Sequence, residues 1–91
     1  MLIRSQDKEI LVNFNVLAGI EIEELPVKTV IISCITGCSY LLGEYSTKKK
    51  AMKVLDMIQD AYERYEYEKA FKTGLTLFET FQMPEDSEVE V

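Results

Sequence analysis

Residues 46–72 read STKKKAMKVLDMIQDAYERYEYEKAFK, and this stretch predicts the one long helix of the chain. The hydroxyls of Ser46 and Thr47 can cap a helix N-terminus. Apolar residues then recur at spacings of four, three, four and three, the period of a helix with one apolar face. We expect the helix to run from about residue 47 to about residue 72, with Gly74 at its C-terminal cap. The stripe consists of Ala51, Leu55, Ile58, Tyr62 and Tyr65, widened by Met52, Val54 and Ala61.

The part of the chain before this helix has the pattern of strands. β-Branched residues fill segment 27–35, as in a buried central strand, and a turn is expected at 36–39. Asn13 and Asn15 indicate a break, and Gly43 indicates a bulge or a close approach. The expected strands are 2–4, 9–14, 16–23, 27–35, 40–45 and, after the helix, 75–83.

Short turns between these strands favour an antiparallel sheet, because a parallel pair needs a crossover of a dozen or more residues. The predicted fold is therefore α+β, with an antiparallel sheet of about five to six strands covered on one face by one long helix. A strongly curled sheet would approach a small barrel capped by that helix. We expect a single domain over residues 1–84 and an acidic, disordered tail over residues 85–91.

The composition of the 91 residues excludes several classes of function. Lys and Arg total 10 against 16 Asp and Glu, which gives a net charge of -6. The chain contains no His, so it lacks Ser-His-Asp and Cys-His catalysis and any imidazole metal site. Its two cysteines cannot form a four-thiolate zinc site. We expect no catalytic residue, metal or cofactor, and nucleic acid is not the default partner of so acidic a chain.

The cysteines and the apolar segments bear on the compartment. Cys34 and Cys38 flank the predicted turn, either as reduced thiols in or near the strands or as a disulfide across the turn. The N-terminal stretch turns polar at once, and segment 27–35 is far shorter than the roughly 20 residues of a membrane-spanning helix. We therefore expect a cytoplasmic protein without membrane contact.

Segments at the start, middle and end of the chain carry a resemblance. They read MLIRSQDK at 1–8, LGEYSTK at 42–48 leading into AMKVLDMIQ at 51–59, and FQMP at 81–84. In these segments the chain resembles a group of small uncharacterised proteins of Gram-positive bacteria and their phages and mobile elements. The resemblance implies a similar fold and a bacterial or phage cytoplasmic setting. It implies no site residues, because the group has no established activity.

Charge is distributed unevenly along the chain. Residues 1–53 carry a net charge of +1, and residues 54–91 carry a net charge of -7. The one basic cluster opposes the positive end of the helix dipole. It is either a solvated first turn or a contact for phosphates or an acidic partner. The acidic tail could also dock on it, or two chains could associate head to tail. The cluster consists of Lys48, Lys49, Lys50 and Lys53.

Aromatic residues follow the second half of the predicted helix at Tyr62, Tyr65, Tyr67 and Phe71. Core packing, or a dimer contact for the surplus rings, is the favoured interpretation. Stacking on nucleic-acid bases is disfavoured, because the interleaved acidic residues would repel a phosphate backbone.

Three glutamates, Glu21, Glu23 and Glu24, mark the third predicted strand. Glu21 and Glu23 share one face, where a hard cation could bridge them. The charged outer face of an edge strand is the favoured interpretation, since such charges discourage pairing with another chain.

The leading functional interpretation is a non-catalytic protein-interaction module, as a homodimer or bound to a protein partner. One helix covers only one face of a sheet, so apolar residues on the other face need a further partner. The alternative is an accessory nucleic-acid-associated regulator that uses the basic start of the helix. The apolar residues that need covering are Leu11, Leu17, Val30, Ile32 and Leu41.

Overall fold

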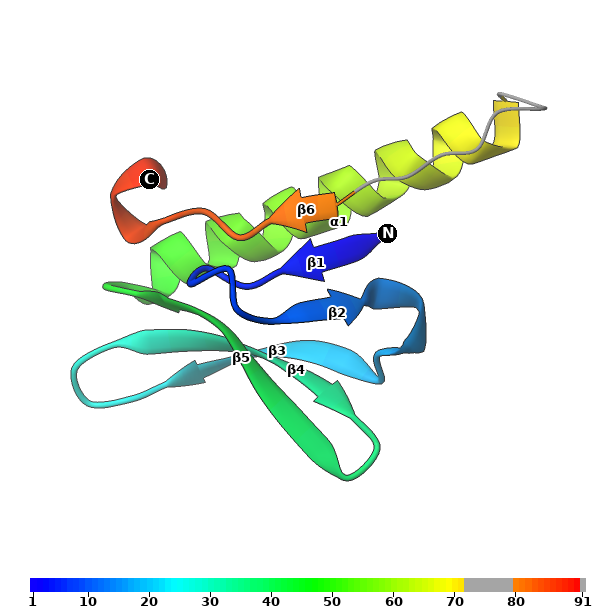
Figure 1. Cartoon of the computed structure of the whole chain (residues 1–91). Helices are drawn as coiled ribbons and strands as arrows, with labels where there is room; N and C mark the ends of the chain where they lie inside the picture. Colours follow the sequence, from blue (N-terminus) through cyan, green and yellow to red (C-terminus); the bar gives the residue numbers. More distant parts are fainter. Residues whose placement is uncertain (72–79, 91) are drawn as a thin grey trace.

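The computed structural model describes residues 1–71 and 80–90, and these residues form an α+β fold (Figure 1). The predicted α+β class is confirmed. One long helix lies beside two small sheets, and its second half extends beyond the strands (Figure 1). In chain order the elements are β1 (Leu2–Arg4), β2 (Leu11–Asn13), the 3₁₀ helix η1 (Phe14–Val16), β3 (Gly19–Glu24), β4 (Thr29–Ile35), β5 (Cys38–Tyr45), α1 (Lys48–Phe71), β6 (Thr80–Gln82) and the 3₁₀ helix η2 (Asp86–Glu88).

The strands form two three-stranded sheets, so the prediction of a single antiparallel sheet is wrong. In the first sheet, in the order β2-β1-β6, β1 pairs with β2 antiparallel and with β6 parallel. The second sheet, in the order β3-β4-β5, is antiparallel throughout. The parallel pair joins strands from opposite ends of the chain, which local turn signals cannot predict. The described strands close no barrel.

The two sheets separate at the break that Asn13 and Asn15 predict. The side-chain oxygen of Asn13 accepts a hydrogen bond of 3.0 Å from the backbone N–H of Asn15. This local bond competes with the ladder and turns the chain into η1. The next strand therefore begins at Gly19 in the second sheet rather than continuing the first.

The predicted strands are present, with shifted ends. Within segment 27–35, Thr29–Ile35 forms β4. Thr36 and Gly37 alone connect it to β5, which is a shorter turn than predicted. Gly37 has a φ of +80°, a backbone conformation that favours glycine over residues with a Cβ. Of the last predicted strand, Thr80–Gln82 forms β6, while residues 75–79 lie outside the described part of the chain.

Gly43 lies both at a β-bulge and at the close approach of another side chain, the two roles that the sequence suggests for it. The register between β4 and β5 shifts there, because Ile31 pairs with Gly43 whereas Ile32 pairs with Leu41. Leu42 is the extra residue of this bulge, and its side chain is buried in the core. A Cβ on Gly43 would lie only 3.0 Å from both Cε2 and Oη of Tyr45, so the glycine makes room for that ring.

Helix α1 confirms the strongest pattern in the sequence. It spans Lys48–Phe71, and the hydroxyl of Thr47 caps it by accepting a 3.2 Å hydrogen bond from the N–H of Lys50. The expected C-terminal cap at Gly74 lies outside the described residues. The fully buried stripe of the helix consists of Ala51, Val54, Ile58 and Ala61, with Leu55, Tyr62 and Tyr65 half-buried beside it.

The C-terminal segment packs against the domain, which corrects the expectation of a tail with little to bury. Glu85 and Glu88 form a capping box around η2, and Val89 is only 4% exposed. The carbonyl of Pro84 accepts a 2.8 Å hydrogen bond from Tyr45 Oη. These contacts fix the described residues up to 90, because one buried apolar side chain anchors an otherwise acidic segment.

Gln6 connects the two sheets. Its backbone N–H donates to the carbonyl of Leu42, and its side-chain oxygen accepts from the N–H of Glu44 at 2.9 Å. The side-chain amide nitrogen donates to the carbonyls of Glu44 and Pro84, both at 3.1 Å. Gln6 therefore satisfies part of the free edge of β5 in place of a further strand.

Tyr45→Phe is expected to lower the free energy of unfolding by about 1 kcal/mol near neutral pH, because it removes a buried hydrogen bond. Burial, followed by the nearby carboxylates of Glu85, Asp86 and Glu88, raises the pKa of Tyr45 above its ordinary value. A raised tyrosine pKa stabilises the fold fully below about pH 10, and this contribution is lost as the pH rises.

The wild-type advantage over Tyr45→Phe should therefore shrink above about pH 10, by about 1.4 kcal/mol per pH unit. Urea unfolding of both chains at about pH 7 and about pH 11 measures this difference. The exposed Tyr40→Phe serves as the control for loss of a tyrosine hydroxyl, and it should not lower stability at about pH 7. An unchanged difference between the two pH values would contradict the role of the buried hydroxyl.

Candidate functional site

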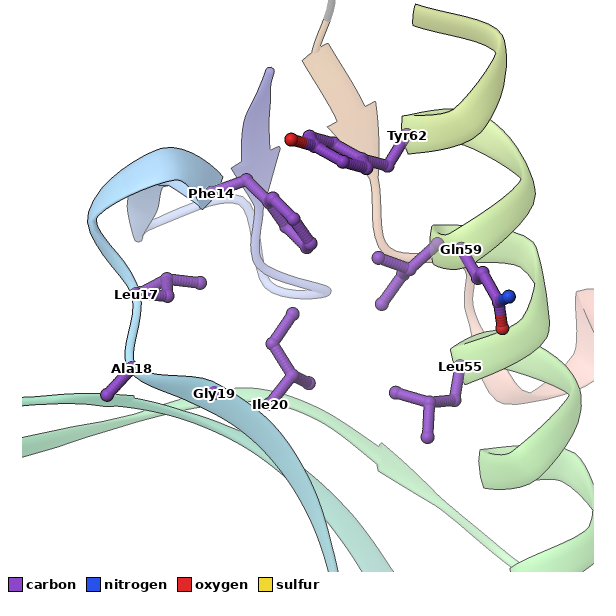
Figure 2. Close-up of a pocket in the computed structure, with 9 residues that line it drawn as sticks. Phe14, Leu17, Ala18, Gly19, Ile20, Leu55, Gln59 and Tyr62 are labelled. Atoms are coloured by element: carbon purple, nitrogen blue, oxygen red, sulfur yellow. The ribbon is translucent and has the colours of Figure 1, made fainter. Parts of the chain in front are cut away.

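An open apolar groove lies between α1 and the segment that leads into β3 (Figure 2). Its volume is about 390 Å³. Figure 2 shows Phe14, Leu17 and Ile20 on one side, facing Leu55 and Tyr62 of α1 on the other. We call this feature the α1–β3 groove, and it is lined by Phe14, Leu17, Ala18, Gly19, Ile20, Leu55, Ile58, Gln59 and Tyr62.

The α1–β3 groove has an apolar floor and few polar groups. Only Gln59 and Tyr62 contribute polar side-chain atoms to the lining. The Gln59 amide donates to Glu63 at 3.1 Å, and a hydrogen bond to Glu66 is the largest factor raising the pKa of Tyr62. Both polar groups are therefore engaged with acidic residues of the same helix. The groove is suited to apolar side chains bordered by positive charge.

The described aromatic residues of α1 divide between this groove, the core and the surface. The rings of Tyr62 and Phe14 pack with their centroids 4.5 Å apart at the end of the groove. Tyr65 packs on the core, with the Nζ of Lys69 lying 6.0 Å from its ring centroid. Tyr67 is 65% exposed, and the side chain of Phe71 lies outside the described part. Core packing is thus the role of the first two tyrosines.

The wall opposite α1 is the part of the groove that the helical pattern does not predict. Leu17 stands out in the sequence as an apolar residue in need of a partner, but Phe14, Ala18 and Gly19 do not. The signal for this wall is the apolar content of η1, directly after the break at Asn13. Val16, on the same segment, is 61% exposed.

The basic cluster is partly neutralised by acidic residues. The Nζ of Lys48 lies 3.2 Å from a carboxylate oxygen of Glu24. The Nζ of Lys50 donates to the backbone carbonyl of Asp86 at 2.9 Å and lies 3.4 Å from its carboxylate. Among the described residues, Lys49 and Lys53 make no ion pair, and both are exposed.

Asp86 brings the acidic C-terminal segment onto this cluster, one of the arrangements that the charge distribution predicts. Its carboxylate accepts hydrogen bonds from the backbone N–H of Ser46 at 2.8 Å and from the Ser46 hydroxyl at 3.1 Å. These bonds, and then the charge of Lys50, hold the pKa of Asp86 below its ordinary value. Lys50 therefore has a structural role.

The glutamates lie on an edge strand, as expected. β3 pairs with β4 alone in the described sheet, and Glu21 and Glu23 point away from the face that carries Ile20 and Ile22. Glu24 contacts Lys48 instead. Within residues 1–71 and 80–90, no group of three or more His, Cys, Asp or Glu side chains is placed to hold a metal ion.

The pairing of β4 with β5 decides whether Cys34 and Cys38 are placed as separate thiols or as a disulfide. Cys34 pairs with Ser39, whereas Cys38 pairs with Ile35, so the two thiols lie on opposite faces of the hairpin. Such side chains cannot form a disulfide without movement of the backbone. The Cys34 thiol donates to Glu21 at 3.3 Å, and this bond is the main cause of its raised pKa.

The apolar residues that the sequence leaves uncovered fall into three groups. Val30 is buried and Ile32 is half-buried on the outer face of the second sheet. Leu11 and Leu41 stay exposed, at 55% and 43%. Leu17 lines the α1–β3 groove. The groove is thus the place where an uncovered residue joins others into one concave surface.

Comparison with known proteins gives no assignment. Among the described residues, no helix has both the length and the apolar character that crossing a membrane requires. No protein-family model, no curated protein and no solved structure matches the chain.

Proposed function

We propose that this chain is a cytoplasmic, self-associating protein-interaction module without catalytic activity, and that the α1–β3 groove is its contact surface. The observation that carries the proposal is an open apolar groove of about 390 Å³ beside the exposed Met52 and Val16. Concave apolar surfaces of this kind bind apolar side chains, and contiguous ones mark interaction sites on small proteins.

The polar groups of the groove support binding rather than catalysis. Gln59 is engaged by Glu63 and Tyr62 by Glu66, so neither polar side chain of the groove is left unpaired to face a substrate. The groove lies between α1 and the segment that leads into β3, and a single copy of the chain forms both walls, so its shape exists before a partner arrives.

The alternative, a nucleic-acid-associated regulator, has weaker support. It requires the basic cluster to face a phosphate backbone. Lys48 and Lys50 are engaged by Glu24 and Asp86, which leaves Lys49 and Lys53 as the available charges. Two lysines on a chain of net charge -6 form a small positive surface.

Sedimentation equilibrium of the full chain tests self-association. Between about 1 and 200 µM, the mass should rise from 10.5 kDa towards twice that value, because dimerisation depends on concentration. Leu55→Asp places a charge in the half-buried groove wall, and it should keep the chain monomeric.

Val27→Asp is the matched control, because it adds the same charge at a highly exposed turn, at the opposite end of β3 from Gly19 of the groove. It should leave the mass of the dimer unchanged. Circular dichroism should show the wild-type helix content in both variants. A wild-type mass of 10.5 kDa at every concentration would refute the proposed function.

A further inference from the structure

On the solvent-facing side of α1, basic residues come first along the helix and acidic residues follow them. Its exposed residues recur at spacings of three and four, so they form one stripe on the helix. Lys49 and Lys53 begin this stripe, three acidic residues follow without any basic residue between them, and the exposed Arg64 comes directly after the last of these at the edge of the stripe. We call this feature the α1 stripe, and it consists of Lys49, Met52, Lys53, Asp56, Gln59, Asp60 and Glu63.

We propose that two copies of the chain pair antiparallel along their α1 stripes, with the twofold axis at the level of Asp56 and Met57. This inference rests on the proposed self-association and assigns its geometry. In that arrangement Lys53 of one copy faces the Asp60 turn of the other, and Lys49 faces its Glu63 turn. Each contact occurs twice, because a twofold interface uses the same patch on both chains.

The charge order itself selects this arrangement. Lys49 and Lys53 have no partner among the ion pairs of the described residues, whereas the other two lysines of the cluster have one each. An antiparallel pair brings these free cations to the acidic half of the second helix. A parallel pair would set lysine against lysine and carboxylate against carboxylate, which is unfavourable.

Met52 provides the apolar contact of this interface. It is 45% exposed on the α1 stripe, one turn before Leu55 of the groove wall. With the axis at the level of Asp56 and Met57, Met52 reaches the turn of Tyr62 in the second copy, at the end of the α1–β3 groove. An unbranched thioether adapts to an irregular apolar surface, so Met52 of each copy fills the groove of the other.

Charge reversal tests the geometry. Variant A carries Lys49→Glu and Lys53→Glu, and variant B carries Asp60→Lys and Glu63→Lys. Each alone should dimerise about ten- to fifty-fold more weakly than the wild type, because every facing pair becomes repulsive. An equimolar mixture of A and B should form a heterodimer of near wild-type affinity, since all facing charges are again opposite.

Net charge cannot explain this set of results. The reversals shift the net charge from -6 to -10 in variant A and to -2 in variant B, so general repulsion would weaken A and strengthen B. Met52→Ala should weaken dimerisation about ten-fold without lowering the stability of the monomer, because Met52 is exposed in the single chain.

Sedimentation equilibrium of the full-length chains, with urea unfolding as the folding control, distinguishes a failure of self-association from a failure of the antiparallel geometry. A monomeric wild type would refute self-association itself. A dimeric wild type whose affinity is unchanged in A and B would refute the antiparallel helix pairing alone. Failure of A and B to form a heterodimer, when both are folded, would also overturn this geometry.

Discussion

Val89→Asp should lower the free energy of unfolding by about 3 kcal/mol, the largest effect that we expect of any single substitution considered for this chain. Val89 is 4% exposed and belongs to the main core cluster, although it lies in a segment with the composition of a disordered tail. A carboxylate cannot stay charged at that position without losing its hydration. The C-terminal segment must therefore leave its site.

Undocking this segment removes more than one apolar contact. Pro84 accepts the buried hydrogen bond of Tyr45, and Asp86 accepts bonds from Ser46 and Lys50. Equilibrium urea unfolding gives the change, and limited proteolysis after Met83 should become faster. Ser87→Asp is the control, because it adds the same charge at an exposed position two residues away. Equal stability of the two variants would contradict the docking of Val89.

Gly43→Ala should lower the free energy of unfolding by about 2 kcal/mol, because the added methyl group meets a ring that cannot move. The new Cβ would lie 3.0 Å from Cε2 and Oη of Tyr45 and 3.3 Å from Cζ. Tyr45 is 1% exposed, and its hydroxyl is bonded to Pro84, so the ring has no free space to retreat into.

Gly19→Ala is the matched control within the second sheet. A Cβ on Gly19 has no atom within 4 Å, and its backbone does not need the left-handed conformation. This change should leave stability the same or raise it by about 0.5 kcal/mol, since alanine restricts the unfolded chain. Similar losses in the two alanine variants would indicate a general cost of replacing glycine, rather than contact with Tyr45.

A double-mutant cycle sharpens this prediction. Tyr45→Phe removes one of the two atoms that lie 3.0 Å from the new Cβ and leaves Cε2 in place. The combined Gly43→Ala and Tyr45→Phe variant should therefore lose less stability than the two single losses added together. Strict additivity would show that the ring hydroxyl and the glycine do not interact.

Helix α1 and its cap at Thr47 could be predicted from sequence because their signals are local. A stripe with a period near 3.6 needs only neighbouring residues to be recognised, and the cap is a bond across three residues. The same holds for the break at Asn13, whose side chain bonds two residues ahead. The period-2 pattern and the β-branched residues place the strands in the same way.

Only the α1 wall of the α1–β3 groove could be predicted from the sequence. Leu55, Ile58 and Tyr62 belong to the helical stripe, but the structure turns part of that stripe towards the groove rather than the core. Phe14 becomes the opposite wall because η1 folds back against the helix, at 4.5 Å between the two ring centroids. Which lysines stay free depends equally on distant partners such as Glu24 and Asp86.

The sequence by itself determined the α+β class, the helix, the approximate strands and the absence of histidine chemistry. Only the tertiary structure decided the division into two sheets, the parallel pairing of β1 with β6 and the docking of Val89. The physical reason is the range of the interactions. Periodicity and capping act over a few residues, whereas β1–β6 pairing and the docking of Val89 join segments far apart in the chain, and the two sheets are completed by such pairings. These features therefore follow from the burial and hydrogen bonding of the whole fold.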